Sequence, residues 1–328
     1  MKRASQLVGV GLFLAALVYV GIALRQTWTS FTDLTQAVSG VGPGVVGGAL
    51  LAYWLSVLVQ SHAWSFGASR LAGDGPQISH RRLLIAYVAA HVYRYLPGNI
   101  GHYLARQYLL RKSSVSQGSL ALASINEIAS QVFAALLCSA MLVPMLADTD
   151  LEALYRHQLL SNATISDAVL VAGLVGLVVL ALVLAFAPVL RQQLMSRLAV
   201  IWMRLTTDPS IFVRSVLANV VFLMVNGVLF ATLLFWYYGL AIELATMVAM
   251  VGMFSLCWLI GFVVPGAPAG LGIRDALLIY LCGTLFLLEG AALLVVAFRF
   301  FQIVGDLILS LIASALSRTA LNSQASIE

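Results

Sequence analysis

Six segments of this 328-residue chain are long and apolar enough to cross a lipid bilayer as helices. A helix needs about 20 apolar residues to span the hydrocarbon core, where its backbone groups must bond to one another. Apolar residues make up 61% of the sequence and charged residues 9%, which excludes a soluble globular domain and a disordered chain. The sequence therefore predicts an all-α, polytopic helical membrane protein. The predicted spans are residues 7–24, 44–68, 118–146, 168–190, 215–238 and 291–316.

Two further apolar segments, residues 81–112 and 244–288, are interrupted by Pro-Gly pairs. Proline removes a backbone donor and pushes the preceding residue out of the helical region, so neither segment is predicted to be one plain helix. We expect each to form a pair of short helices with Pro97, Pro265 and Pro268 as hinges. The first has basic residues at both ends and is predicted to be re-entrant. The second is either a hairpin or two short spans.

Lysine and arginine predict the orientation, because they concentrate in cytoplasmic loops. Placing the N-terminus inside leaves twelve of them in cytoplasmic loops and two in outer loops. We therefore expect a multi-pass protein of the plasma (inner) membrane with both termini in the cytoplasm. The same loops account for the net charge of +5. No basic run is interleaved with aromatic residues in a polar segment, so nucleic acid is not an expected partner.

The broken segments occupy equivalent places in two parts of the chain, residues 1–146 and 168–316. Each break is preceded by two spans and followed by one, and Arg106 and Arg274 each follow a proline by nine residues. In the predicted orientation the two parts begin on opposite sides of the membrane, as in many secondary transporters. We treat residues 1–328 as a single transmembrane domain, for which an inverted-topology repeat is one interpretation.

Charged and small residues near the breaks are candidates for binding an anion. A charge at the centre of a bilayer costs about 2.5–3.5 kcal/mol, so it needs a reason to be there. Arginine stays charged and offers phosphate two parallel hydrogen bonds, and small residues at a helix start let a ligand approach. The alternatives are arginines that snorkel to the interface and a local pair of Arg274 with Asp275. The candidate lipid-phosphate residues are Arg94, Gly98, Asn99, Gly101, Arg106, Gly270, Gly272 and Arg274.

Other polar side chains are expected to line the interior or act as a gate. Arg299, Gln302 and Asp306 share one face of the last predicted span. Glu127 is expected to neutralise an arginine of the site, and Asp306 to pair with Arg299. The alternative is that these are structural ion pairs that hold helices together. The candidate lining residues are His91, His102, Glu127, Arg299, Gln302 and Asp306.

Three motifs carry a family resemblance. The sequence RYLPGNIGHYLAR at 94–106, then Asn126-Glu127, then PGAPAGLGIRD at 265–275 resemble the transmembrane region of lysylphosphatidylglycerol synthases. The resemblance extends over essentially the whole chain and implies a flippase-like helical bundle. It implies roles for Pro97, Gly101, Arg106, Glu127, Pro265, Pro268, Gly270, Gly272 and Arg274.

Two departures from the family pattern concern charged positions. The family often has Glu-Arg where this chain has Asn126-Glu127, and often has Glu at the position of Asp275. A third departure is that the soluble aminoacyl-transferase domain of the fused members has no counterpart in this sequence. We therefore expect a stand-alone member that does not make lysylphosphatidylglycerol.

The expected function is that of a flippase or transporter for an anionic phospholipid, an aminoacylated lipid or a polyprenol-phosphate-linked glycolipid. One alternative is a non-catalytic membrane subunit of a cell-envelope glycosyltransferase pathway, with a cytoplasmic glycosyltransferase or lipid-modifying enzyme as partner. Another is a membrane glycosyltransferase that uses Asp148 and Asp150, a D-x-D motif in a predicted outer loop. We find no nucleophile motif, cofactor motif or metal-ligand spacing. We therefore expect no enzyme activity, no cofactor and no metal.

Overall fold

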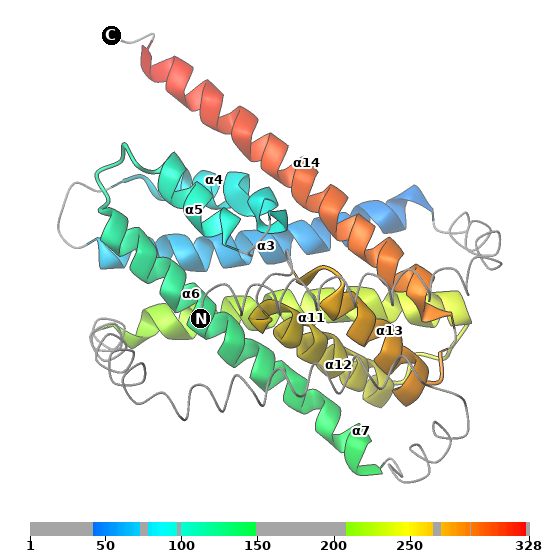
Figure 1. The fold of residues 1–328 in the computed structure, drawn as a ribbon. Coiled ribbons are helices and arrows are strands. Elements are labelled where there is room, and N and C mark those ends of the chain that lie inside the picture. The colour runs from blue at the N-terminus through cyan, green and yellow to red at the C-terminus, as the bar shows by residue number, and fades with distance from the viewer. Residues whose placement is uncertain are drawn as a thin grey trace, which may run out of the picture.

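The computed structural model describes residues 42–72, 78–96, 100–148, 208–264, 270–288 and 290–325. Every regular element in these ranges is a helix, which confirms the all-α prediction (Figure 1). The predicted spans 7–24 and 168–190 lie outside the described residues.

Five helices in the described ranges are long and apolar enough to cross a membrane. Four of them begin and end close to predicted spans, and the fifth, α12, forms the first part of the second broken segment. The third predicted span is one helix whose last turns change pitch. The bounds are α3 Pro43–Leu71, α6 Gln117–Ser139 with η3 Ala140–Leu142 and α7 Val143–Asp148, α11 Pro209–Tyr238, α12 Leu244–Val263 and α14 Ala291–Ala325.

Local sequence signals explain where the long helices start and stop. Pro43 and Pro209 occupy the first turns of α3 and α11, where proline removes no helical hydrogen bond. Ser116 caps α6 by accepting a hydrogen bond from the Ser119 N–H at 3.1 Å. Gly239 ends α11 at φ 62°, a left-handed conformation that glycine adopts without a steric penalty. These signals make the helix ends readable from the sequence.

The first broken segment consists of α4 (His80–Ala90), the 3-10 turn η2 (His91–Tyr95) and α5 (Gly101–Leu109). Leu96, the residue before the proline, is extended with ψ 146°, as the ring of the following proline requires. The helices α4 and α5 pack side by side (Figure 1). At 1.5 Å per residue, the nine residues of α5 reach about 14 Å, less than half of a hydrocarbon core. Neither short helix therefore spans a bilayer.

The second broken segment is built differently. Its first helix, α12, has 20 residues and is about 30 Å long, enough to cross the hydrocarbon core. Its second helix, α13 (Ile273–Leu285), has 13 residues and is about 20 Å long, too short to do so. The segment is therefore a span-length helix followed by a short one, a division that the sequence left open.

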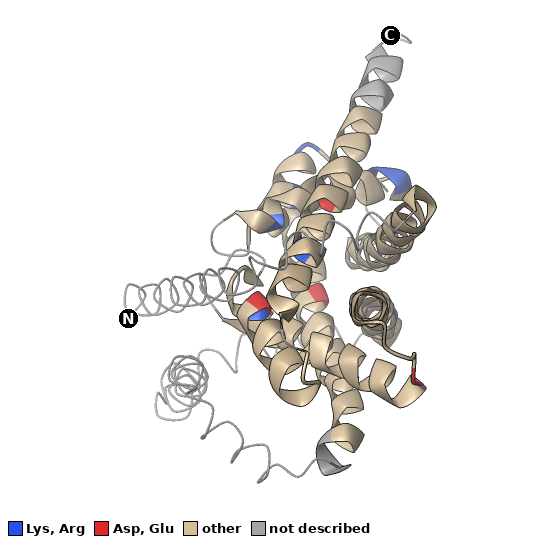
Figure 2. Cartoon of the chain, turned by 90° about the vertical axis from the view of Figure 1, so that its right-hand side faces the viewer, with Lys and Arg blue, Asp and Glu red and all other residues tan. Residues whose placement is uncertain are grey.

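The helices form one bundle in which α11 packs against α3, α6 and α12. Close packing of α11 on α12 depends on Gly227, because a Cβ atom there would lie 3.0 Å from Val251. The last helix, α14, runs across the bundle and contacts α3, α4, η2 and α13 (Figure 1). Figure 2 shows acidic and basic positions of several helices within this bundle. The arrangement therefore brings both broken segments and α14 around the same interior.

Candidate functional site

A buried polar cavity lies where the two broken segments meet. Arg94 and Arg106 reach it from the first segment and Arg274 reaches it from the second, although 168 residues separate Arg106 from Arg274 in the sequence. The cavity has about 20 Å³ of free space, room for a single water molecule. Its other lining residues are Gln60, Tyr87, His91, His102, Glu127, Gln131, Phe222, Trp258 and Phe262.

Arg106 is held by an acidic side chain of another helix. Its side chain on α5 is 1% exposed and forms a two-pronged ion pair with Glu127 on α6; the second of the two hydrogen bonds, Nη2 to Oε1, is 3.3 Å long. The Tyr87 hydroxyl donates to the same carboxylate at 2.7 Å, and its ring lies 3.6 Å below the guanidinium carbon. Glu127 thus occupies the fork of Arg106 that a phosphate would take. The expected neutralisation of a site arginine by Glu127 is present in this geometry.

Arg274 has a weaker set of partners. Its Nη2 atom donates to the uncharged Gln302 Oε1 at 2.9 Å, and its Nε atom lies 3.5 Å from Asp275 Oδ1 without a hydrogen bond. The other oxygen of Asp275 accepts from the Gly272 N–H at 3.1 Å and so caps α13. Arg274 therefore keeps more unused donors than Arg106, although both are buried.

Gly270 and Gly272 give the chain the turn that precedes Arg274. Their φ angles are 69° and 81°, values that other residues rarely adopt. A Cβ atom at Gly270 would lie 3.2 Å from the backbone of Gly261 on α12. These two glycines thus fold the start of α13 against α12 and place Arg274 at the cavity.

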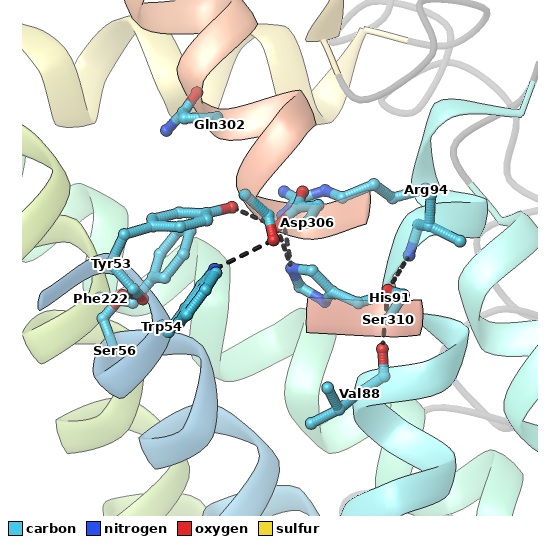
Figure 3. A network of polar contacts seen from close by, with 12 residues as sticks. Tyr53, Trp54, Ser56, Val88, His91, Arg94, Phe222, Gln302, Asp306 and Ser310 are labelled. Carbon is cyan, nitrogen blue, oxygen red and sulfur yellow. Dashed lines mark hydrogen bonds and ion pairs between the residues drawn. The ribbon is translucent and has the colours of Figure 1, made fainter. Parts of the chain in front are cut away.

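A second polar cluster surrounds Asp306 on α14 (Figure 3). The hydroxyls of Tyr53 and Tyr95 donate to its carboxylate at 2.5 and 2.7 Å, and His91 Nε2 lies 3.6 Å from it. Arg94 Nη1 donates to the same His91 nitrogen at 3.0 Å. The cluster therefore joins α3, η2 and α14, and it shares His91 and Arg94 with the cavity.

The two remaining lining candidates also lie in the interior. Gln302 links Arg274 to α11, because its Nε2 atom donates to Asn226 Oδ1 at 2.7 Å. Arg299 Nε lies 3.9 Å from Asp275 Oδ2, so this arginine approaches the acid next to Arg274. The expected pairing of Asp306 with Arg299 stays a prediction, because no such hydrogen bond or ion pair is described.

Several buried nitrogen atoms at the cavity have no hydrogen-bond partner among the described residues. They are Arg106 Nε, Arg274 Nε, His91 Nδ1 and His102 Nδ1. Buried polar atoms are rarely left unpaired, so such a group of them is typical of a place where a ligand or water binds. The lining carries three arginines and one glutamate, a formal charge of 3 − 1 = +2 with neutral histidines. The site is therefore suited to an anion.

Some predicted residues lie elsewhere or outside the described residues. Gly101 starts α5 and faces the bend, where a Cβ atom would collide with the Tyr93 carbonyl oxygen. Asp148 is the last residue of α7. The residues outside the described ranges are Pro97, Gly98, Asn99, Asp150, Pro265 and Pro268. Among the described residues no group of three or more His, Cys, Asp or Glu is arranged to hold a metal.

Sequence reasoning missed the tyrosine partners of the acidic residues and one hydrogen bond between two amides. Tyr53, Tyr87 and Tyr95 bond to Asp306 or Glu127, and Gln60 joins Asn219 on α11 at 2.7 Å. One signal was available, because Tyr87 precedes His91 by four residues and so shares its helix face. The others come from distant helices and had no local signal.

Comparison with families of known proteins gives a match. The family described as the lysylphosphatidylglycerol synthase TM region matches residues 6–310, most of the chain. No curated protein matches the chain. Together with the five span-length helices, the family match shows a multi-pass membrane protein.

Proposed function

Because the chain belongs to the family of the lysylphosphatidylglycerol synthase TM region, we propose that it moves a phosphate-bearing membrane lipid between the leaflets of the plasma membrane. The observation that carries this proposal is the buried cavity of charge +2 between the two broken segments. The cargo classes are an anionic phospholipid, an aminoacylated lipid and a polyprenol-phosphate-linked glycolipid, which share a phosphate. The proposed movement requires no bond to form or break. The proposal also places both termini in the cytoplasm.

The charge of the cavity supports a phosphate as the group that is bound. Burying a net positive charge within a lipid bilayer is costly unless an anion accompanies it. Among the described residues, the interior holds the buried Arg106, Arg274 and Arg299 and the half-buried Arg94 against the buried Glu127, Asp275 and Asp306, an excess of one positive charge. A phosphate of a lipid headgroup would balance this excess and use the unpaired arginine donors.

The size of the cavity indicates that the structure is a closed arrangement. About 20 Å³ accommodates one water molecule, so a phosphate requires the helices to move apart. The short helices α4 and α5 are suited to such a movement, because neither is held across the whole bilayer. In the open arrangement a phosphate takes the place of Glu127 at Arg106 and adds hydrogen bonds to Arg274. Rocking of the two parts then exposes the site to the other leaflet.

The test is lipid exchange by the purified protein in phosphatidylcholine vesicles. Each preparation contains one fluorescent probe, namely phosphatidylglycerol, lysylphosphatidylglycerol or a polyprenol-phosphate sugar, and bleaching of the outer leaflet reports movement. We expect faster exchange of at least one probe with the wild type. Arg274→Gln removes one positive charge and should slow this exchange at least about tenfold, since a charge-assisted hydrogen bond contributes about 1.5–3 kcal/mol.

Two companion variants separate binding from folding. Arg106→Gln with Glu127→Gln removes both members of the ion pair, leaves no unpaired buried charge, and should fold but exchange lipid slowly. Arg214→Gln changes an exposed arginine beside Phe66 and should leave exchange unchanged. Exchange at the wild-type rate in Arg274→Gln, or in the folded double variant, would contradict the proposal.

A further inference from the structure

A large groove lies on the other side of the first broken segment from the buried cavity. We propose that this groove, the α4–α5 groove, binds an anionic phospholipid of the cytoplasmic leaflet, with the phosphate at its basic end and an acyl chain along its apolar part. The proposal rests on the proposed function and names the route by which the lipid reaches the site. The groove is defined by Arg81, Arg82, Ile85, Leu104, Tyr108 and Lys112, and Ser314 and Ser317 of α14 also line it.

The chemistry of the groove changes along its length. Arg81 and Arg82 at the start of α4 and Lys112 after α5 are exposed and form a basic end, with Ser113 and Ser317 beside them. None of the described residues that line the groove is Asp or Glu. The positive-inside rule places this basic end at the cytoplasmic surface, where lipid phosphates lie. The basic end is therefore complementary to a lipid headgroup.

The rest of the groove is suited to an acyl chain. Its lining includes Ile85, Leu96, Leu104 and Tyr108, and the last three are 50%, 56% and 61% exposed. The open space is about 1020 Å³, against about 20 Å³ in the buried cavity. A free inorganic phosphate would leave the apolar part uncovered, whereas a phospholipid fills both parts. Charge and apolar surface together thus favour a lipid over a soluble anion.

One layer of short helices separates the groove from the buried cavity. On α5, Arg106 lines the cavity while Leu104 and Tyr108 line the groove. On η2, Arg94 lines the cavity and its neighbour Tyr93 lines the groove. A movement of this layer is therefore enough to bring a phosphate from the groove to the arginines. The lipid therefore binds in the groove before its phosphate enters the buried cavity.

Photo-crosslinking to the full-length protein in vesicles tests the groove without requiring transport. The probe is phosphatidylglycerol with a photoreactive acyl chain, compared with the same modification on phosphatidylcholine, and mass spectrometry locates the labelled residues. We expect phosphatidylglycerol to label the peptide that contains Leu104 and Tyr108 more strongly. Arg82→Gln with Lys112→Gln should lower this labelling about thirtyfold, because each of the two cations contributes about 1 kcal/mol to anionic-lipid binding near the membrane surface.

A matched control removes two other exposed arginines. Arg70 and Arg214, which each lie over Phe66 and do not line the groove, are changed to Gln and should leave labelling intact. Equal labelling by the two lipids, or equal loss in the control, would overturn the proposal, because the groove would then hold bulk lipid only. Arg274→Gln should keep the labelling while it loses exchange. Labelling without exchange in the wild type would contradict the transport function and leave the lipid site standing.

Discussion

The two broken segments share a sequence pattern but are held in different ways. In the first, two short helices flank the break, and Arg106 is paired with Glu127 from another helix. In the second, a span-length helix precedes the break, and Arg274 bonds to the amide of Gln302. The acid nearest to Arg274 is its own neighbour Asp275, which also caps α13.

Arg106 and Arg274 each follow a proline by nine residues, but nearby carboxylates neutralise their charges to different degrees. The guanidinium of Arg106 has its charge matched by a carboxylate that uses both oxygens. Arg274 shares its nearest carboxylate with the Gly272 N–H and with Arg299. The first segment is therefore the better neutralised and the second the more available to a ligand.

Removal of Glu127 should have the largest effect on stability. Glu127→Ala leaves Arg106 as a buried charge without its acid, a change that costs about 3–5 kcal/mol in buried pairs. Thermal unfolding of the purified protein in detergent measures it. Asp275→Asn is the comparison in the second segment and should cost clearly less, because Arg274 keeps Gln302. Equal destabilisation by the two variants would remove the distinction between the segments.

Glycine substitutions at the two bends should have an intermediate effect. Gly101→Ala places a Cβ atom against the Tyr93 carbonyl, and Gly270→Ala forces a residue with a side chain to φ 69°. Overcrowding of this kind costs about 1–3 kcal/mol. Gly48→Ala in α3 is the control, because nothing lies within 4 Å of the added atom, and it should not destabilise. Wild-type unfolding temperatures for both bend variants would show that neither turn needs glycine.

The smallest effect is expected at a helix cap outside both segments. Hydrogen bonds from Ser210 lower the pKa of the half-exposed Asp208 carboxyl at the start of α11. Because this pKa is lower in the folded protein, the stabilisation is present above the pKa of the unfolded chain and is lost as the pH falls through the folded value. Asp208→Asn should therefore have a lower unfolding temperature than the wild type near neutral pH and match it in acid.

The cap of α6 provides the control for this pH dependence. Ser116 accepts a hydrogen bond from Ser119 without a titrating group, so Ser116→Ala should lose about 1 kcal/mol at every pH. A cap effect at Asp208 that does not change with pH would mean that its charge plays no part. Unfolding curves of both variants at a series of pH values provide the comparison.

Much of the fold follows from local sequence. The predicted spans 44–68, 118–146, 215–238 and 291–316 lie within or close to α3, α6 to α7, α11 and α14. A run of about 20 apolar residues has no other stable conformation in lipid, because its backbone groups must bond within the helix. The division of the second segment into a long and a short helix was less accessible, because its length fits both a hairpin and two spans.

Part of the candidate site could also be predicted from the sequence. Charged residues are rare in apolar segments, so Arg94, Arg106, Glu127 and Arg274 stand out, and the structure lines one cavity with them. The tyrosines that bond to the acidic residues do not stand out, because a tyrosine is uncharged and its ring is apolar. The tyrosine that bonds to Asp306 from α3 is separated from it by 253 residues. Such contacts depend on how distant helices pack.

The sequence by itself determined a helical membrane protein with two Pro-Gly breaks and a set of buried charges, since lipid penalises both free backbone groups and unneeded ions. Only the tertiary structure decided which charges meet. It paired Arg106 with Glu127, gave Arg274 a hydrogen bond to the neutral Gln302 beside a longer contact with Asp275, and set the basic α4–α5 groove one helix away from the cavity. The physical reason is that an ion pair depends on a few ångströms between side chains of different helices, a distance that no local pattern encodes.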